Sequence, residues 1–315
     1  MPVCGKKVGL LLPIKEGIMD GHTPRGEDVL AMARRAEDIG LDSVWLVDHF
    51  LHEPYVDEQA FGHQMPEDMK GHKVGFWECW TMAAAIAVAT ERVEIGTLVT
   101  NTGYRNPTLL ARMIDTVDEL SDGRLICGVG AGDFPSEYQM YGYDWGRRVG
   151  KFEEALQILT PMLRGESVSF DGEFYFANDA ELRPRGPRSD GPPLLIGLLE
   201  GGPRMRRLVA QYADHWNCWL VGGRDYDSCY EVVVQACRKH GRDPATLVKN
   251  AAIGMWMPGR ECTDPAINPM TGSAEELAEQ LRSFLSKDID HVVIRLDPMT
   301  LDGLHQLDDV LGLLD

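Results

Sequence analysis

The chain has 315 residues, of which 44% are hydrophobic and 25% charged, and this composition can bury the core of one soluble domain. Its net charge of −18 excludes the basic face that nucleic-acid binding requires. No apolar run approaches the roughly 20 residues of a membrane span, and the N-terminus has no signal-peptide core. The seven cysteines lack metal or disulfide spacing, so we expect reduced thiols and a cytoplasmic protein.

Strand and helix patterns alternate along the whole chain. Short apolar runs predict strands at 7–14, 43–50, 93–99, 125–129, 194–199, 215–220, 251–257 and 291–296. Amphipathic or capped segments predict helices at 27–39, 77–90, 107–120, 148–163, 203–212, 226–240, 273–286 and 301–314. Eight such units in 315 residues predict an α/β fold, a (β/α)8 or TIM barrel, which takes about 250 residues plus insertions.

An open doubly wound sheet is the alternative. It would need a G-x-G-x-x-G turn after the first strand, and the glycines at 128, 130 and 132 follow the fourth strand with another spacing. We therefore expect one barrel domain over 1–315, with an insertion at about 133–193 after the fourth strand. We expect no regular secondary structure in the later part of this insertion, 164–193.

Barrel enzymes place their chemistry where strands end at the carboxyl face. The candidates at these ends are Asp48, His49, Thr97, Leu98, Thr100, Ala131, Gly132, Asp133, Glu137, Gly201, Gly202, Pro203 and Arg204. We favour Asp48 and His49 facing a bound ring, with His49 able to exchange a proton near neutral pH. The alternative is that Asp48 is a rim residue bonded to a neighbouring loop. Histidines 52, 63 and 72 crowd the same region, but no metal-binding motif is present, and we expect no metal.

Two glycines precede the helix that begins at Pro203. Exposed N–H groups at the positive end of a helix, with Arg204 beside them, suit a phosphate. A loop that only needs positive φ angles would use the same glycines. The position after a late barrel strand favours the phosphate.

Several blocks of this chain resemble the bacterial-luciferase-like flavin and deazaflavin oxidoreductases. They are SVWLVDHF at 43–50, GTLVT at 96–100, YRNP at 104–107, SDGRL at 121–125 with GVGAG at 128–132, Glu137 with Tyr141-Gly142, LIG at 195–197 with GGP at 201–203, and YADHWN at 212–217. The match runs in order along nearly the whole chain. The combination of DHF with LVTNTGYRNP looks most like the coenzyme F420-dependent branch.

The resemblance implies a tricyclic ring in the barrel mouth. Asp48 and His49 would line a deazaflavin ring, and Thr97-Leu98 would hold a non-proline cis peptide behind it. The other residues that the resemblance places at the cofactor are Thr100, Ala131, Gly132, Asp133, Glu137, Gly201, Gly202, Pro203 and Arg204. Two positions depart from the branch: Asp133 stands where relatives often have tryptophan, and Glu200 where many have a glycine.

The implied reaction is hydride transfer between C5 of F420 and a small organic substrate. His49 is the first choice for handling the proton and Asp133 the second, with Asp48 beside them. The alternative is an FMN-dependent monooxygenase that uses reduced flavin from a separate reductase together with O₂. A cofactor-binding barrel without catalysis is the second alternative, because fold does not fix chemistry.

The sequence also predicts some partners. The alanine-rich helix at 81–90 fits a homodimer interface like those of family members, although tight packing on the barrel explains it almost as well. No nucleic-acid or membrane partner is expected. The substrate would be chosen by the loops at 51–76, 133–150 and 164–193, whose sequences do not identify it.

Overall fold

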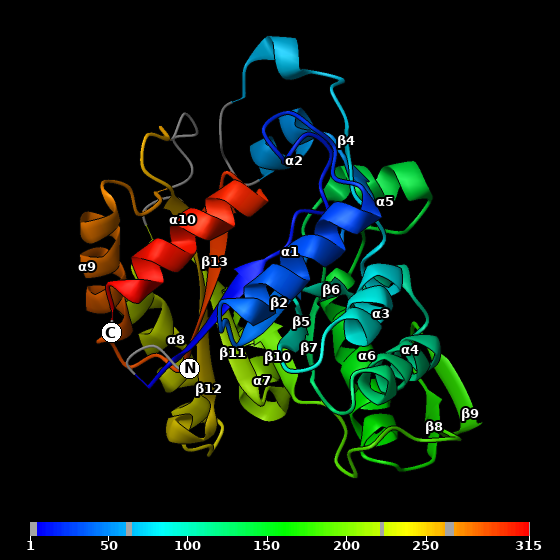
Figure 1. The fold of residues 1–315 in the computed structure, drawn as a ribbon. Coiled ribbons are helices and arrows are strands. Elements are labelled where there is room, and N and C mark those ends of the chain that lie inside the picture. Colours follow the sequence, from blue (N-terminus) through cyan, green and yellow to red (C-terminus); the bar gives the residue numbers. More distant parts are fainter. Residues whose placement is uncertain (1–4, 61–64, 221–223, 262–267, 315) are drawn as a thin grey trace.

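The computed structural model describes residues 5–60, 65–220, 224–261 and 268–314, and its centre is a closed parallel barrel (Figure 1). Its strands are β1 (Lys7–Leu11), β2 (Ser43–Leu46), β5 (Glu94–Thr97), β7 (Leu125–Gly130), β10 (Leu194–Gly197), β11 (His215–Trp219), β12 (Val248–Trp256) and β13 (His291–Asp297). They lie in the order β10-β11-β12-β13-β1-β2-β5-β7, and parallel pairing of β7 with β10 closes the ring. The predicted barrel is confirmed.

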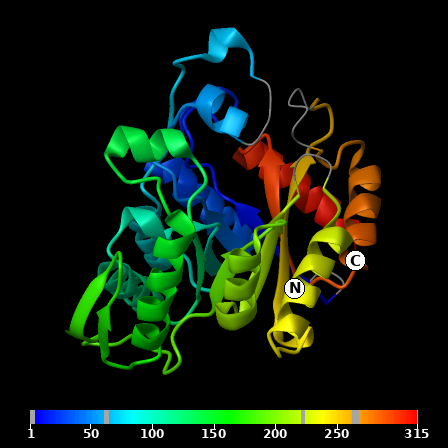
Figure 2. The same cartoon turned by 180° about the vertical axis from the view of Figure 1, so that it is seen from behind.

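Helices surround the barrel on the outside, as both views show (Figures 1 and 2). They are α1 (Gly26–Asp38), α3 (Cys79–Ala89), α4 (Pro107–Leu120), α6 (Arg148–Leu163), α7 (Pro203–Tyr212), α8 (Tyr226–Lys239), α9 (Ala274–Leu285) and α10 (Leu301–Gly312). Local sequence explains where several begin. The Asn106 side chain accepts from the Thr108 N–H ahead of Pro107, and Ser273 forms a capping box with Glu276. None of the described helices is long and apolar enough to cross a membrane.

Short helices and strands lie in the stretches for which the sequence predicted no regular element. The stretch 51–76 contains β3 (Leu51–His52), α2 (Pro54–Ala60), η1 (Glu67–Met69) and β4 (Val74–Gly75), and further short elements are β6 (Thr100–Asn101), η2 (Thr102–Tyr104), α5 (Pro135–Tyr141) and η3 (Pro244–Thr246). The prediction that 164–193 has no regular secondary structure is wrong in part. β8 (Val168–Asp171) and β9 (Phe176–Ala180) pair there as an antiparallel hairpin. The hairpin is largely exposed, so it lacks the apolar alternation of a buried strand.

Three expected strand ends also differ by three residues or more. β1 ends at Leu11 rather than at residue 14. β2 ends at Leu46 rather than at residue 50, because Val47 to Phe50 leave the ladder and enter the mouth. β12 begins at Val248, three residues before the expected start at 251, and Lys249 and Asn250 pair with β11 despite their polarity. Tertiary pairing, rather than hydrophobic pattern, sets these ends.

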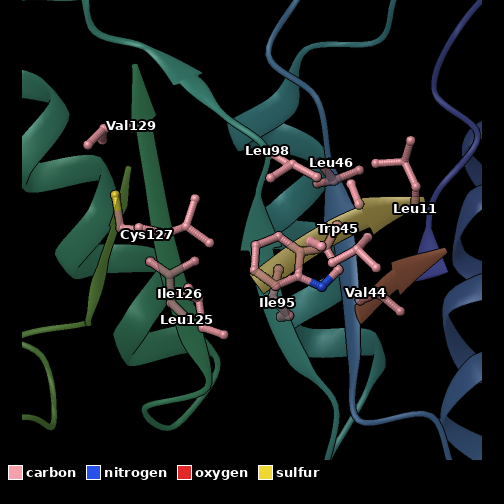
Figure 3. Packing of buried hydrophobic residues seen from close by; sticks show 14 of the residues in the cluster. Leu11, Val44, Trp45, Leu46, Ile95, Leu98, Leu125, Ile126, Cys127 and Val129 are labelled. Atoms are coloured by element: carbon pink, nitrogen blue, oxygen red, sulfur yellow. The ribbon is translucent and has the colours of Figure 1, made fainter. Parts of the chain in front are cut away.

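Trp45 fills the barrel beneath the mouth. It is fully buried, and Figure 3 shows it among Val44, Leu46 and Ile95. Its indole lies on the backbone of Gly96, where an added Cβ would come within 2.1 Å of a ring carbon. The indole N–H donates to the Ser43 hydroxyl at 2.6 Å. Strand positions on both faces are buried, as expected for a parallel barrel covered by helices.

Candidate functional site

The candidate active site lies at the carboxyl ends of the strands, on the side where α2, β4 and α5 lie in Figure 1. His49 follows β2 and Glu137 lies in α5. The Nδ1 of His49 donates to Oε2 of Glu137 at 2.9 Å. The Glu137 side chain is completely buried, whereas the imidazole of His49 is 16% exposed. No hydrogen bond joins Nε2 of His49 to any described residue, so this nitrogen is available to a ligand.

Glu137 organises the loop that carries His49. Its Oε1 accepts from the N–H groups of Phe50 (2.6 Å) and Leu51 (3.0 Å), and its Oε2 accepts from the Tyr104 hydroxyl at 2.6 Å as well as from His49. Four donors around one buried carboxylate fix both the backbone after β2 and the orientation of the imidazole.

The charges of this pair stabilise each other. Burial by itself would lower the pKa of His49, but the hydrogen bond to Glu137 and the nearby Asp133 outweigh it, so the pKa is raised. Burial would likewise raise the pKa of Glu137, but the hydrogen bonds from His49 and Tyr104 hold this pKa below its ordinary value. The pair therefore favours a protonated His49 beside an ionised Glu137.

Asp48 is held by a network of polar groups. Arg105 holds its carboxylate through two bonds of 2.6 and 2.9 Å, and the Asn101 N–H donates to it at 2.9 Å. Arg105 also donates to Glu78 at 2.7 Å. Asp48 is 1% exposed, and this network ties the end of β2 to the segment after β6. The sequence placed Asp48 at the ring but did not find its partner Arg105, although Arg105 lies in the YRNP block.

Asp133 and Phe134 border the mouth next to His49. Asp133 is exposed to solvent. Desolvation by the surrounding protein nevertheless raises the pKa of its carboxyl group above the ordinary value, and the charge of His49 acts in the opposite direction. The Phe134 ring stacks on His49 with centroids 4.3 Å apart and on His52 with centroids 4.7 Å apart. His52 is 5% exposed, and its Nδ1 lies 3.5 Å from Oδ2 of Asp57. The Phe134 ring thus packs against both imidazoles.

The loop after β5 contains a non-proline cis peptide, at Leu98–Val99. The expected position, Thr97-Leu98, is wrong by one peptide. Thr97 is still the last residue of the β5 ladder, and its hydroxyl donates to the Gly128 carbonyl at 2.8 Å and accepts from the Gly128 N–H at 3.0 Å. The hydroxyl of Thr97 is therefore used between strands, and the irregular peptide falls beyond it.

The loop after β7 approaches its neighbours closely. Gly132 has a φ of +84°, and a Cβ there would come within 2.2 Å of the Tyr138 hydroxyl. Ala131 accepts from the same hydroxyl at 3.2 Å. Thr100, at the start of β6, is fully buried, and its Oγ1 has no hydrogen-bond partner in the described part of the chain. A polar ligand atom would satisfy it.

The predicted phosphate loop is exposed at the start of α7. Gly202 is the N-cap without a side-chain cap, Pro203 is the first helical residue, and Gly201 has a φ of +49°. Arg204 does not reach over the loop, because its Nε donates to Glu153 of α6 at 2.5 Å. Glu200 is exposed. In the described ranges no three His, Cys, Asp or Glu side chains gather as metal ligands, and residue 63 lies outside those ranges.

A parallel barrel with a polar, histidine-bearing mouth is the architecture of a barrel enzyme. Residues 6–255 match the family model of the luciferase-like monooxygenases, and the chain belongs to this family of oxidoreductases. The family membership that the sequence blocks indicated is confirmed.

Several relatives are similar to this chain. An F420-dependent glucose-6-phosphate dehydrogenase from Amycolatopsis mediterranei is 32% identical over 197 residues, which cover 61% of this chain and 53% of the relative. A phthiodiolone/phenolphthiodiolone dimycocerosates ketoreductase from Mycobacterium kansasii is 33% identical over 192 residues, covering 60% and 51%. The chain spans about half the length of these curated relatives.

A solved structure supports the fold over the full length. An F420-dependent secondary alcohol dehydrogenase, in complex with an F420-acetone adduct, aligns with a TM-score of 0.78 over 100% of both chains. Its sequence identity of 21% makes this a likeness of fold.

Proposed function

We propose that this protein binds coenzyme F420 and transfers hydride between the cofactor and a small organic substrate. The observation that carries the proposal is the His49–Glu137 pair after β2, in which Nδ1 is bound to Glu137 at 2.9 Å and Nε2 has no hydrogen-bond partner among the described residues. The similarity to a relative that is F420-dependent by name supports the choice of cofactor.

The residues of the mouth fit a polar, phosphorylated cofactor. The buried Oγ1 of Thr100 lacks a partner among the described residues, and a ring carbonyl or N–H would supply one. At the start of α7, no atom lies within 4 Å of the place where a Cβ on Gly202 would be. The N–H groups of this helix end have room for a phosphate.

When bound, F420 supplies the carbon that accepts or releases hydride. The protein then has to bind the substrate, place its reacting carbon and handle one proton. His49 is suited to handle the proton, because its raised pKa favours the protonated form that donates to a carbonyl oxygen. Its Nε2 has no hydrogen-bond partner among the described residues. In the opposite direction the neutral ring accepts the proton of a hydroxyl. Asp133 is the second candidate for this role.

Asp48 acts as a positioning residue. Its bonds to Arg105 and to the Asn101 N–H hold the chain at His49 in place. Phe134 stacks on the imidazole and limits the space in which a substrate can approach Nε2. The neutral, apolar character of this wall favours a small organic molecule.

Fluorescence titration of the cofactor-free protein with F420 and with FMN tests the proposal. Micromolar binding of F420 with much weaker binding of FMN is the expected result. Tight FMN binding with weak F420 binding would instead assign the protein to the FMN-dependent monooxygenases, which receive reduced flavin from a separate reductase. Binding of F420 without turnover of any alcohol or carbonyl substrate would identify a non-catalytic cofactor-binding barrel.

A further inference from the structure

An open pocket of about 400 Å³ lies between the start of α6, the start of α7 and the tip of the β8–β9 hairpin. Three arginines line it, together with Phe174 of the hairpin tip: Arg147 is the N-cap residue of α6, Arg148 is its first residue, and Arg204 lies in α7. We call it the arginine pocket.

The arginine pocket adjoins both parts of the candidate cofactor site. Nε of Arg148 donates to the carbonyl of Gly132, in the loop after β7, at 3.2 Å. Arg204 belongs to the predicted phosphate loop at the start of α7, and an added Cβ on Gly150 in α6 would lie 3.4 Å from one of its terminal nitrogens. A ligand that passes from the barrel mouth over the start of α7 therefore enters this pocket.

The guanidinium groups retain unused donors. Arg148 stacks on Trp145, with Cζ 4.2 Å from the ring centroid, and no carboxylate of the described residues lies within ion-pair distance of it. Arg147 pairs with Glu173 through one nitrogen and lies over Phe174, while Arg204 uses its Nε on Glu153. Each guanidinium has five N–H donors, and most of the donors in the pocket have no partner among the described residues, so they can bind an anion.

The acidic residues near the pocket are already engaged. Glu153 is shared between Arg204 and Arg207. Glu154 accepts the backbone N–H groups of residues 173, 174 and 175, at 2.8 to 3.1 Å, and thereby holds the hairpin tip. In a chain with a net charge of −18, this pocket gathers cations that carboxylates do not fully neutralise.

We propose that the arginine pocket binds the carboxylate chain of the cofactor that continues beyond its phosphate. This rests on the proposed function, because F420 carries glutamate residues after its phosphate whereas FMN ends at the phosphate. Arg148 and Arg147 hold the carboxylates, and the start of α7 holds the phosphate. The pocket thereby selects the longer, more acidic cofactor, because each added ion pair is available only to it.

The test compares F420 bearing a long oligoglutamate tail with the form that has no glutamate, by fluorescence titration at low and high salt. The wild-type protein should bind the long-tailed form about tenfold more tightly at low salt, and salt should reduce this advantage. Arg148→Gln should remove most of the advantage while the tail-less form binds within about twofold of wild type. Arg164→Gln is the matched control, because it removes the same charge at the far, exposed end of the same helix region.

Equal affinity of the wild-type protein for both forms would overturn the inference and leave the proposed function intact. An equal loss for both forms in Arg148→Gln would also overturn it, since the arginine would then act only through Gly132. Arg147→Gln, whose side chain is 64% exposed, provides a second variant that should fold normally and reduce the tail advantage. Failure of the wild-type protein to bind either form would refute the proposed function itself.

Discussion

His49 and Glu137 are joined by a 2.9 Å hydrogen bond across 88 residues of sequence, and this bond connects the end of β2 to α5. It fixes Nδ1 of the imidazole and leaves Nε2 without a hydrogen-bond partner among the described residues. A buried carboxylate behind a partly exposed histidine is a common way to set the orientation and the pKa of a catalytic imidazole.

Glu137→Gln should lower the pKa of His49. In the native protein the carboxylate outweighs burial and raises this pKa, so a neutral amide leaves burial as the main influence. The charged pair stabilises the fold below the unfolded-state pKa of about 6.5, and this contribution is lost as pH rises through the higher native pKa. NMR titration of the imidazole resonances measures the change. Glu119→Gln, on the exposed side of α4, is the control. An unchanged pKa of His49 in Glu137→Gln would contradict the coupling between the two residues.

His49→Ala should reduce turnover by about 10²-fold or more while F420 affinity stays within a few fold, because general acid–base catalysis contributes that much to rate. Steady-state kinetics with fluorescence binding on the same preparation separates the two effects. His72→Ala removes an exposed histidine of the neighbouring loop and should leave both values unchanged. An unaltered rate in His49→Ala would remove this residue from the proton-handling role.

Gly96→Ala should destabilise the protein by about 3 kcal/mol, because the new methyl group would enter the space of the Trp45 indole and force an overpacked core to shift. Urea unfolding followed by tryptophan fluorescence measures the loss. Gly26→Ala, at the start of α1, has no atom near its new Cβ and should change stability little. Equal stability of the two variants would show that Trp45 does not rest on Gly96.

The sequence predicted the barrel because its strands are buried on both faces and its helices carry clear boundaries. The apolar run at Val44 to Leu46 and the Asn106-Pro107 helix start are signals contained in a few neighbouring residues. The exposed β8–β9 hairpin offers no such signal, and it was not predicted.

The sequence does not indicate which residues of the site contact one another. His49 and Glu137 were both identified as candidates, but their contact depends on the path of the loop between β2 and α5. Asp48 was identified as a candidate, but its bond to Arg105, 57 residues away in the sequence, was not predicted. The cis peptide was expected one position too early, since a resemblance places a motif more reliably than a single peptide bond within it.

We propose that the outward face of α3 forms a homodimer interface, as the alanine-rich segment 81–90 suggested. Val88 on this face is 68% exposed, and Leu109 of the neighbouring α4 is 54% exposed. Val88→Glu should therefore convert a dimer to a monomer in analytical ultracentrifugation, because it places a charge in an apolar contact. Phe176→Glu, on β9, alters a similarly exposed apolar residue outside α3 and α4 and should leave the dimer intact. A wild-type monomer at all concentrations would refute this interface.

Acid should weaken the fold through two histidines at the amino ends of the barrel strands. Burial lowers the pKa of His291 to about 3 and that of His215 to about 4, so both stay neutral in the native state at mildly acidic pH. In the unfolded chain they take up protons below about pH 6.5, so the unfolded state binds more protons between that pH and the native values. The free energy of unfolding should thus fall as pH is lowered below about 6.5, by up to about 1.4 kcal/mol per pH unit for each histidine.

His291→Gln separates this effect from the titration of carboxylates. Nε2 of His291 lies 2.7 Å from the Ser43 hydroxyl, and glutamine can keep a hydrogen bond there without titrating. The variant should lose stability less steeply than wild type between pH 6.5 and pH 4, whatever its stability at pH 7. His305→Gln on the exposed side of α10 should leave the slope unchanged. Parallel pH profiles for wild type and His291→Gln, measured by urea unfolding, would mean that His291 is protonated in the native barrel or is already neutral in the unfolded chain.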